Sequence, residues 1–265
     1  MRYNYRQVQR MTPFYYTTIA AAAGIAGAAF FLPGQAAWLG AGIPLFAWLA
    51  LTAAGVFIMR LNYFCASIRR GKAGKKRIAL TFDDGPDPAA TPALLDLLKA
   101  RGARATFFCV AGRAKEQAGL LRRIKEEGHT LGNHSYAHSW LTNFLAGRPL
   151  RAEILRAQQM FKDILGEAPK YYRSPMGLTN PHLGPVLKTT GLKLVGWDIR
   201  PFDRGIPAKT TAARINGAAV DGSIVLLHDG GADPENLSVA VSGIIGHFTA
   251  LGYSFVNLDE LLGDI

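Results

Sequence analysis

The chain has 265 residues, of which 49% are hydrophobic, and its formal net charge of +11 comes almost entirely from the first third. No Asp or Glu precedes Asp83, whereas ten Lys or Arg residues do, and the residues from Asp83 onward carry a net charge of only +1. These basic residues flank uncharged hydrophobic runs instead of covering a folded face with aromatic residues between them. This pattern excludes nucleic-acid binding as their explanation and indicates a membrane. Two cysteines, Cys65 and Cys109, far apart in the chain, do not indicate a disulfide framework.

Two uncharged segments lie near the start of the chain: residues 14–32, rich in Ala and Gly, and residues 36–59, separated by Pro33-Gly34-Gln35. Each is long enough to cross a hydrocarbon core of ~30 Å, which takes about 20 residues. A signal peptide has a shorter apolar run and is not followed at once by a second one. The sequence therefore predicts a transmembrane helical hairpin, in preference to a signal peptide or to two buried helices of a soluble protein.

Positive charge lies on both flanks of this hairpin, and its turn is uncharged. Three basic residues precede the hairpin and seven follow it: Arg2, Arg6, Arg10, Arg60, Arg69, Arg70, Lys72, Lys75, Lys76 and Arg77. Basic flanks favour the cytoplasmic side, so we expect two spans in a bacterial inner membrane and a following domain on the cytoplasmic face. If only one run spans the membrane, that domain lies outside instead. Residues 1–76 are predicted to form the hairpin and a basic linker placed to contact anionic headgroups, and residues 77–265 to form the second domain.

From Arg77 onward, strand-like and helix-like segments alternate. Short apolar segments predict strands at 77–82, 105–110, 130–133, 170–173, 192–197, 223–228 and 253–256. Helices are predicted between them, most of them followed by a glycine, at 92–101, 118–127, 150–165, 181–190, 208–219 and 237–250. This alternation favours an α/β fold with a parallel sheet and helices outside it.

Ionisable side chains stand where these predicted strands end. Asp83 and Asp84 follow the first strand and precede Gly85-Pro86, a strong turn signal. Two adjacent carboxylates repel each other, and a nearby cation or arginine relieves that cost; alone, the pair fits solvated turn residues or a helix cap equally well. In a parallel α/β barrel the carboxyl ends of the strands converge on one face. Later strands end at or near further ionisable residues: His134, His138, Arg173, Asp198, Asp203, His228 and Asp229.

His134 and His138 are four residues apart, so on a helical turn they share a face that suits two imidazoles on one metal ion. By itself such a pair fits surface or capping histidines at least as well. With an aspartate from another strand it gives three protein ligands and leaves positions open for water and substrate, as a catalytic metal requires.

Two more residues at strand ends allow a catalytic and a structural interpretation. His228 comes from a distant part of the chain and suits a general acid, or a hydrogen-bonded histidine at a strand end. Arg173 would orient Asp83 and keep it ionised if the two lie side by side, and otherwise is an ordinary linker charge. The remaining histidines lack such a context and are interpreted as structural or exposed: His129, His182 and His247.

Four motifs, in this order and spacing, resemble those of the NodB-type polysaccharide deacetylases, carbohydrate esterase family 4: Thr81-Phe-Asp-Asp-Gly-Pro86, His134-Ser-Tyr-Ala-His138, Arg173-Ser-Pro175 and Val225-Leu-Leu-His228. The resemblance covers about residues 77–258. It implies a distorted, incomplete (β/α) barrel that removes acetyl groups from sugars with a divalent metal, usually zinc, with cobalt and nickel as alternatives. It also implies that Asp83 is the general base and that the metal ligands are Asp84, His134 and His138. It further implies that His228 is the general acid and that Arg173 holds Asp83 in place. Asp203 is implied as an acidic partner of either Arg173 or His228.

The sequence departs from this family pattern at three positions. Met176-Gly177 stands where many members have Tyr-Gly, Arg204 where a Trp is common, and Val225 where Leu is usual. Met176 contributes chiefly a backbone N–H to the oxyanion in this interpretation, so its side chain is not critical. The departures leave the chemistry in place and concern the surface that binds the sugar.

The resulting prediction is a metal-dependent hydrolase that removes N-acetyl or O-acetyl groups from a sugar, an oligosaccharide or a lipid-linked glycan. Its expected partners are a carbohydrate or glycolipid substrate and membrane lipids, with no nucleic acid and no protein partner. Two other interpretations stay open: a deformylase or amidase acting on a lipid-linked amino sugar, and a catalytically silent glycan-binding module. An intact set of ionisable residues favours an enzyme over the silent module.

Overall fold

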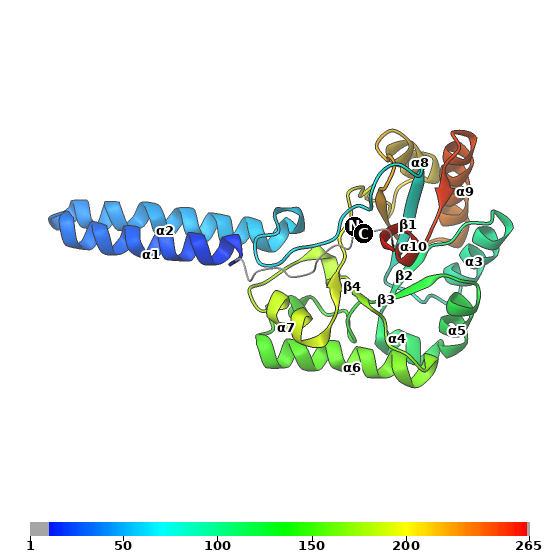
Figure 1. Ribbon diagram of the computed structural model, residues 1–265, viewed down its shortest axis with the longest axis horizontal. Coiled ribbons are helices and arrows are strands. Elements are labelled where there is room, and N and C mark those ends of the chain that lie inside the picture. The colour runs from blue at the N-terminus through cyan, green and yellow to red at the C-terminus, as the bar shows by residue number, and fades with distance from the viewer. Residues whose placement is uncertain (1–10, 264–265) are drawn as a thin grey trace.

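The computed structural model describes residues 11–263, so Arg2, Arg6 and Arg10, which support the predicted orientation, lie outside the described residues. A helical hairpin projects from a domain built on one curled sheet (Figure 1). All strand pairs in this sheet are parallel, as predicted, in the order β5-β4-β3-β2-β1-β6, with β7 beside the start of β1. The strands are β1 Arg77–Asp83, β2 Thr106–Cys109, β3 Thr130–Asn133, β4 Tyr171–Tyr172, β5 Lys193–Leu194, β6 Ile224–His228 and β7 Ser254–Phe255.

Strand β1 is the centre of the sheet. From Ile78 to Asp83 every residue of this strand is buried, because the strand has β6 on one side, β2 and β7 on the other, and packed helices outside. Asp83 is in register with His228 of β6. Since all strands run in the same direction, their carboxyl ends meet at one edge of the curled sheet, and the ionisable residues that follow them meet there too.

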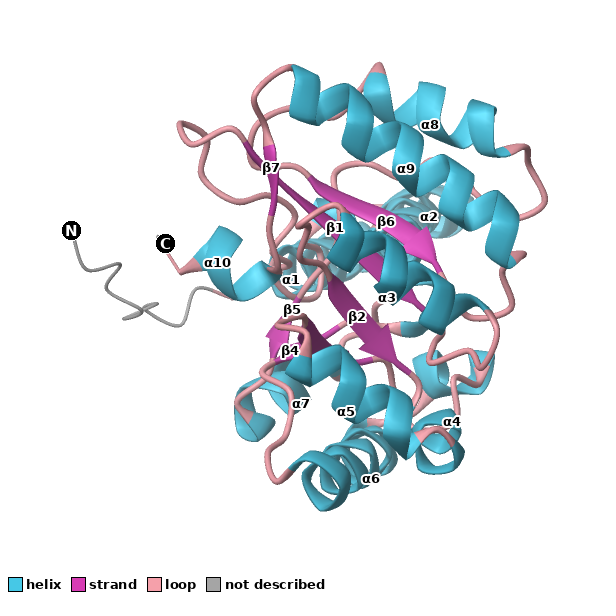
Figure 2. Ribbon diagram, turned by 90° about the vertical axis from the view of Figure 1, so that its right-hand side faces the viewer, coloured by secondary structure: helices cyan, strands magenta, loops and turns pink. Residues whose placement is uncertain are grey.

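Helices pack around the outside of the sheet (Figure 2). In α6 the buried residues Leu150, Ile154, Ala157 and Phe161 recur at helical spacing and face the core, and Gly166 ends the helix in the left-handed conformation. All six predicted helices are present, with ends shifted by a few residues. The helices of this domain are α3 Ala90–Ala100, α4 Ala111–Glu116, α5 Ala118–Glu126, α6 Gly147–Leu165, α7 Leu183–Thr190, α8 Ala208–Asn216, α9 Pro234–Ala250 and α10 Leu258–Leu262.

Five predicted strands are shorter in the structure, and two short helices, α4 and α10, were not predicted. Strand β4 ends at Tyr172, shortly before Pro175, which has no backbone N–H to continue a ladder. After Leu194 the chain pairs instead with Ile68, a residue far earlier in the sequence. Helix α10 does carry a local signal, since Asn257 and Glu260 form a capping box at its start.

The segment between the hairpin and β1, which was predicted to be a linker, forms backbone hydrogen bonds with the sheet domain. The Ile68 N–H donates to Leu194 O at 2.9 Å, and the Gly196 N–H donates to Ile68 O at 2.8 Å. Three residues later the Gly71 N–H donates to Gly222 O at 2.8 Å, just before β6. Residues 68–71 thus join the β5 end of the sheet to the β6 end, across the side that the named strands leave open.

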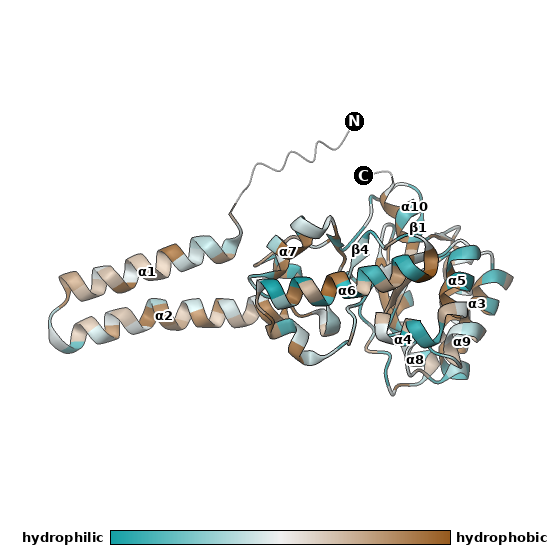
Figure 3. Ribbon diagram, turned by 90° about the horizontal axis from the view of Figure 1, so that it is seen from below, coloured by the Kyte–Doolittle hydropathy of each residue, from teal (hydrophilic) through white to brown (hydrophobic). Residues whose placement is uncertain are grey.

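The N-terminal hairpin consists of α1 Pro13–Phe31 and α2 Gly34–Phe57, which lie side by side (Figures 1 and 3). In each helix only 6% of the most apolar 18-residue stretch is buried, so these are not core helices of a soluble protein. The polar groups of Thr18 and Trp48 bond within the hairpin: the Trp48 Nε1–H donates to Thr18 Oγ1 at 2.9 Å, and that hydroxyl donates to Phe14 O at 2.7 Å. Both helices are long and apolar enough to cross a membrane.

The end of α2 is attached to the sheet domain by a short loop. The Thr179 N–H donates to Val56 O at 3.1 Å, and the Thr179 hydroxyl donates to Gly55 O at 2.8 Å. Gly55 also packs closely against the ring of Tyr63, where a Cβ would come within 2.2 Å of a ring carbon. The domain is therefore held directly against the last turn of α2.

Candidate active site

Most of the ionisable residues predicted at the strand ends surround one cavity of about 420 Å³ at the carboxyl edge of the sheet. Six of the seven site residues predicted from the sequence line it, and the seventh, Arg173, lies buried just beneath, in contact with Asp83. The lining residues are Asp83, Asp84, His134, His138, Met176, Gly177, Trp197, Arg200, Phe202, Asp203, Arg204, Leu226 and His228.

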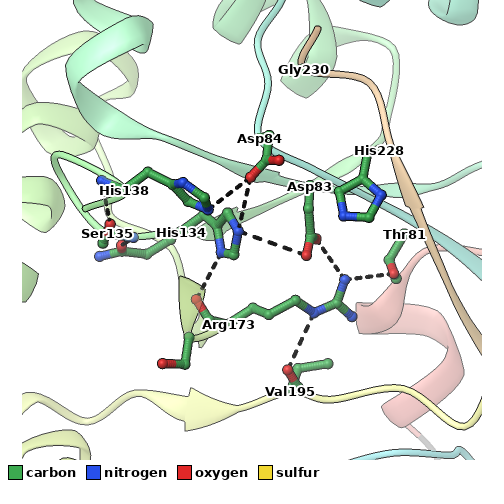
Figure 4. A network of polar contacts seen from close by, with 12 residues as sticks. Thr81, Asp83, Asp84, His134, Ser135, His138, Arg173, Val195, His228 and Gly230 are labelled. Carbon is green, nitrogen blue, oxygen red and sulfur yellow. Dashed lines mark hydrogen bonds and ion pairs between the residues drawn. The ribbon is translucent and has the colours of Figure 1, made fainter. Parts of the chain in front are cut away.

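Asp84, His134 and His138 bring three ligand atoms within 4.8 Å of one another. The Nε2 atoms of His134 and His138 lie 3.3 and 2.9 Å from Asp84 Oδ1 (Figure 4). That oxygen is buried and has no hydrogen-bond donor among the described residues. A buried carboxylate oxygen that faces two imidazole nitrogens is a donor set suited to a divalent cation.

The tautomer of His134 supports this interpretation. Its Nδ1 lies 2.9 Å from the carbonyl oxygen of Arg173, so the ring N–H on Nδ1 donates to that carbonyl and leaves the Nε2 lone pair directed at Asp84. A histidine that binds a metal ion characteristically uses its second nitrogen in this way. The residues present therefore fit a metal ion.

The charge of the site favours a cation. Burial lowers the pKa of His134, but Asp83 and Asp84 outweigh that effect and raise its pKa overall. Burial also raises the pKa of Asp84, but the adjacent imidazoles of His134 and His138 outweigh this effect and hold that pKa well below its usual range. The same carboxylates that favour a proton on His134 would attract a divalent ion in its place.

A loop, not a helical turn, brings His134 and His138 together, so the helical interpretation of their spacing was wrong. Residues 134–138 follow β3 without helical structure, and Ser135 and His138 both have positive φ, at 67° and 50°. Side chains stabilise this bend. Asn133 Oδ1 accepts from the Ser135 N–H at 2.8 Å, and Ser135 Oγ accepts from the His138 N–H at 2.9 Å.

Arg173 lies beside Asp83, as predicted. The arginine is completely buried, and its Nη1 donates to Asp83 Oδ1 at 2.7 Å and to Thr81 Oγ1 at 2.8 Å. Its Nε donates to the Val195 carbonyl at 3.3 Å (Figure 4), and its Nη2 donates to the Gly196 carbonyl at 2.9 Å. These contacts fix the guanidinium, and they hold one oxygen of Asp83 while the other lies on the side of His134, 3.8 Å from its Nε2.

His228 lies on the other side of Asp83 from the histidine pair (Figure 4). Its Nδ1 is 2.9 Å from Asp203 Oδ1, and its backbone N–H donates to Asp203 Oδ2 at 2.9 Å. Of the two partners considered for Asp203, the contact found is therefore with the histidine. Asp198, at the preceding strand end, does not join the site, because it bonds to Ser223, Ile224 and Arg70.

Sequence reasoning missed several neighbours of Asp84. Arg204, noted only as a departure from the family pattern, forms an ion pair with Asp84 Oδ2. Arg113, from α4, donates to the Asp84 carbonyl at 2.5 Å. The turn after β6 comes so close that a Cβ on Gly230 would meet Asp84 O at 2.2 Å, which explains a glycine there. These contacts cross between distant segments and leave no local signal.

Asp229, noted at a strand end but given no role from the sequence, is also of chemical interest. It is fully buried, accepts a hydrogen bond from the Thr91 hydroxyl at 2.5 Å, and has no donor for its other oxygen among the described residues. Burial raises its pKa to about 7, and the charges of Asp83 and Asp84 add to this effect. Asp229 lies behind the site and packs against Gly85. A Cβ added to Gly85 would come within 2.3 Å of the Asp229 carboxylate.

Comparison with known proteins agrees with the four motifs. A model of the family described as polysaccharide deacetylase matches residues 70–195. A peptidoglycan-N-acetylglucosamine deacetylase of Bacillus cereus is 36% identical over 191 residues, which cover 71% of this chain and 89% of that protein. The chain belongs to the polysaccharide deacetylase family.

Two further relatives extend this result. A chitooligosaccharide deacetylase of Azorhizobium caulinodans is 36% identical over 155 residues, which cover 58% of this chain and 73% of that protein. A crystal structure of a peptidoglycan N-acetylglucosamine deacetylase, in complex with 4-naphthalen-1-yl-N-oxidanyl-benzamide, superimposes with a TM-score of 0.70 at 30% identity and covers 74% of this chain and 92% of that one. The predicted NodB-type incomplete barrel is thereby confirmed, and a carbohydrate deacetylase activity is supported.

Proposed function

We propose that this polysaccharide deacetylase is a membrane-bound, metal-dependent hydrolase that removes an N-acetyl or O-acetyl group from a sugar, an oligosaccharide or a lipid-linked glycan. The observation that carries the proposal is the convergence of Asp84, His134 and His138 beside Asp83, whose carboxylate Arg173 holds. The direct test is release of acetate from N-acetylated glycans by the purified full chain. No release from chitooligosaccharide, peptidoglycan fragments or lipid-linked amino sugars would refute it.

Asp84, His134 and His138 would hold the metal, with zinc the expected ion and cobalt or nickel the alternatives. When bound, a divalent ion polarises the acyl carbonyl and lowers the pKa of the attacking water. This assignment rests on the buried, donor-free Asp84 Oδ1 and on the tautomer of His134. Adding each ion separately to chelated protein, followed by metal analysis and acetate release, tests which ion the chain uses.

Asp83 is proposed as the general base that accepts a proton from the attacking water. Arg173 fixes one oxygen of Asp83, so the other oxygen, toward His134, stays in a defined position for that proton. Met176 lines the cavity, and its backbone N–H is proposed to donate to the oxyanion. His228 is proposed as the general acid that protonates the leaving amine, and Asp203 holds its Nδ1 so that Nε2 carries out the transfer.

The hairpin is proposed to span the bacterial inner membrane twice, with the catalytic domain in the cytoplasm. Basic residues on both flanks and an uncharged turn support this orientation. Its consequence is a cytosolic or membrane-linked sugar precursor as substrate, not finished polymer. A reporter active only in the cytoplasm and another active only outside, each fused after Ile265, test the orientation. Activity of the outside reporter alone would overturn both the topology and the choice of substrate.

A lipid-linked amino sugar with a formyl group in place of acetyl is the second candidate substrate. The attachment of α2 to Thr179, three residues from Met176 in the cavity wall, favours a substrate carried by the membrane. Mass spectrometry of products from matched acetylated and formylated glycolipids separates the two activities. A silent glycan-binding module is disfavoured because no predicted catalytic or ligand residue is missing from the site. Absence of turnover with every metal would support that module.

A further inference from the structure

A cluster of exposed hydrophobic side chains lies immediately after His138. Trp140, Leu141 and Phe144 are 62%, 52% and 65% exposed, although they occupy a single short 3-10 helix, Trp140–Phe144. The rings of Trp140 and Phe144 contact each other edge to face, with centroids 5.8 Å apart. None of the three lines the catalytic cavity, so a role as a wall of the sugar site does not explain them.

The 3-10 helix that carries this hydrophobic cluster is hydrogen-bonded to Ser174 and Asn180, in the loop that contacts the end of α2. Asn143, buried between the exposed residues, accepts a hydrogen bond from the Ser174 hydroxyl at 3.0 Å, and its carbonyl accepts one from Asn180 Nδ2 at 2.8 Å. Asn180 follows Thr179, which bonds to Gly55 and Val56 of α2. A short chain of hydrogen bonds through Asn180 and Thr179 therefore connects the cluster to the last turn of α2.

The dimensions of the hairpin put this point at a membrane surface. Trp38 near the turn and Phe57 at the end of α2 are both highly exposed, and the helix between them is ~29 Å long at 1.5 Å per residue. This length matches a hydrocarbon core of about 30 Å. Tyr15 and Tyr16, at the start of α1, are exposed at the same end as Phe57, where an aromatic belt is expected.

We propose that Trp140, Leu141 and Phe144 insert into the interfacial layer of the bilayer that holds the hairpin. The 3-10 helix then forms a third membrane contact beside the two spans and fixes the orientation of the catalytic cavity toward that surface. Because His138 precedes this contact by two residues, the cavity takes sugars presented at the membrane surface, such as the head group of a glycolipid. The inference rests on the membrane insertion proposed above and not on catalysis.

Depth-dependent quenching in vesicles tests this contact on the full chain. Phe144→Cys would be labelled with a bimane fluorophore in phosphatidylcholine–phosphatidylglycerol vesicles with and without lipids that carry a nitroxide near the head group. Val239→Cys is the matched control, since Val239 is a 50% exposed hydrophobic residue on α9, which lies at the end of the domain away from the hairpin (Figure 1). Phe57→Cys reports on the hairpin, and unsubstituted chain treated with the label corrects for Cys65 and Cys109.

We expect quenching at positions 144 and 57 to exceed that at position 239 several-fold. Quenching at position 57 but not at 144 would overturn the inference and leave the membrane spans in place. Quenching at none of the three would refute both, while acetate release would still report on the proposed chemistry. Protection of position 144 that depends on protein concentration, without quenching, would indicate contact with a second copy and would also overturn it.

A second measurement uses the double variant Trp140→Ser/Phe144→Ser. Its activity on an acetylated glycolipid in vesicles, divided by its activity on soluble chitooligosaccharide, should fall several-fold relative to the unsubstituted chain. An unchanged ratio would contradict a membrane role for these side chains. An equal fall in both activities would point to a sugar-binding role instead and would likewise contradict the inference.

Discussion

Replacement of Arg173 tests how the buried ion pair supports the site. The guanidinium is completely buried and donates to Asp83, Thr81, Val195 and Gly196. Arg173→Met would leave the 4% exposed Asp83 without its cationic partner and the two carbonyls without a donor. Breaking a buried pair on one side costs roughly 3–5 kcal/mol, so we expect a loss of that size in the free energy of unfolding.

Arg173→Lys separates charge from geometry. A lysine keeps the positive charge but cannot reproduce the planar fork that reaches four acceptors, so we expect an intermediate loss of about 1–3 kcal/mol. Turnover should fall ~10–100-fold in the lysine variant, because Asp83 loses its fixed orientation. Hydrogen exchange of the β1 and β6 amides in the full chain, in detergent micelles, measures the opening free energy.

A double variant provides the control for this experiment. In Asp83→Asn/Arg173→Met no buried charge remains in the pair, so the combined loss of stability should be smaller than the sum of the two single losses. Strict additivity would show that the two groups do not interact energetically. Unchanged stability in Arg173→Met would refute the argument altogether.

Three further predictions concern the proposed general base, the partner of the proposed general acid, and a buried histidine outside the site. Asp83→Asn should keep its metal and lose ~10²–10⁴-fold in turnover, because an amide cannot accept the proton; a near-normal rate would place the base elsewhere. Asp203→Asn should lower turnover while metal content stays constant, since His228 loses its carboxylate partner; a loss of metal would contradict this role. Burial lowers the pKa of His129 to about 4, and its Nδ1 accepts the Ala105 N–H at 3.1 Å. Neutral His129 therefore stabilises the fold above its unfolded pKa of about 6.5, and this contribution of ~3 kcal/mol is lost as the pH falls toward 4. His129→Asn keeps an acceptor without titrating, so its acid unfolding should be shallower than that of the control, exposed His247→Asn.

The sequence was sufficient for those parts of the site that depend on local patterns. A short apolar strand followed by two aspartates marks β1 and its polar end, and the order of strands and helices indicates a parallel sheet. Since parallel strands end at one edge, the meeting of Asp83, His134 and His228 could be expected before any coordinates. The contact of Arg173 with Asp83 agrees with what the family resemblance implied, while the residues alone also allowed an ordinary linker charge.

Long-range contacts were not predictable in this way. The pairing of Ile68 beside Val195 joins segments more than a hundred residues apart and uses backbone groups that any sequence carries. The ion pair of Arg204 with Asp84 likewise depends on the path of an irregular loop. The bend after β3 was mistaken for a helical turn because a four-residue spacing has no unique conformation, and the side chains of Asn133 and Ser135 decide the local structure.

The central claim is that Asp84, His134 and His138 hold a metal ion on which deacetylation depends. The most direct measurement is acetate release by the full chain after chelation and during stepwise addition of zinc, with metal content determined on the same samples. We predict that activity vanishes on chelation and returns in proportion to a single bound ion, and that His134→Ala and His138→Ala lose both metal and activity. Full activity of the chelated chain, or full metal occupancy in His134→Ala, would contradict the account.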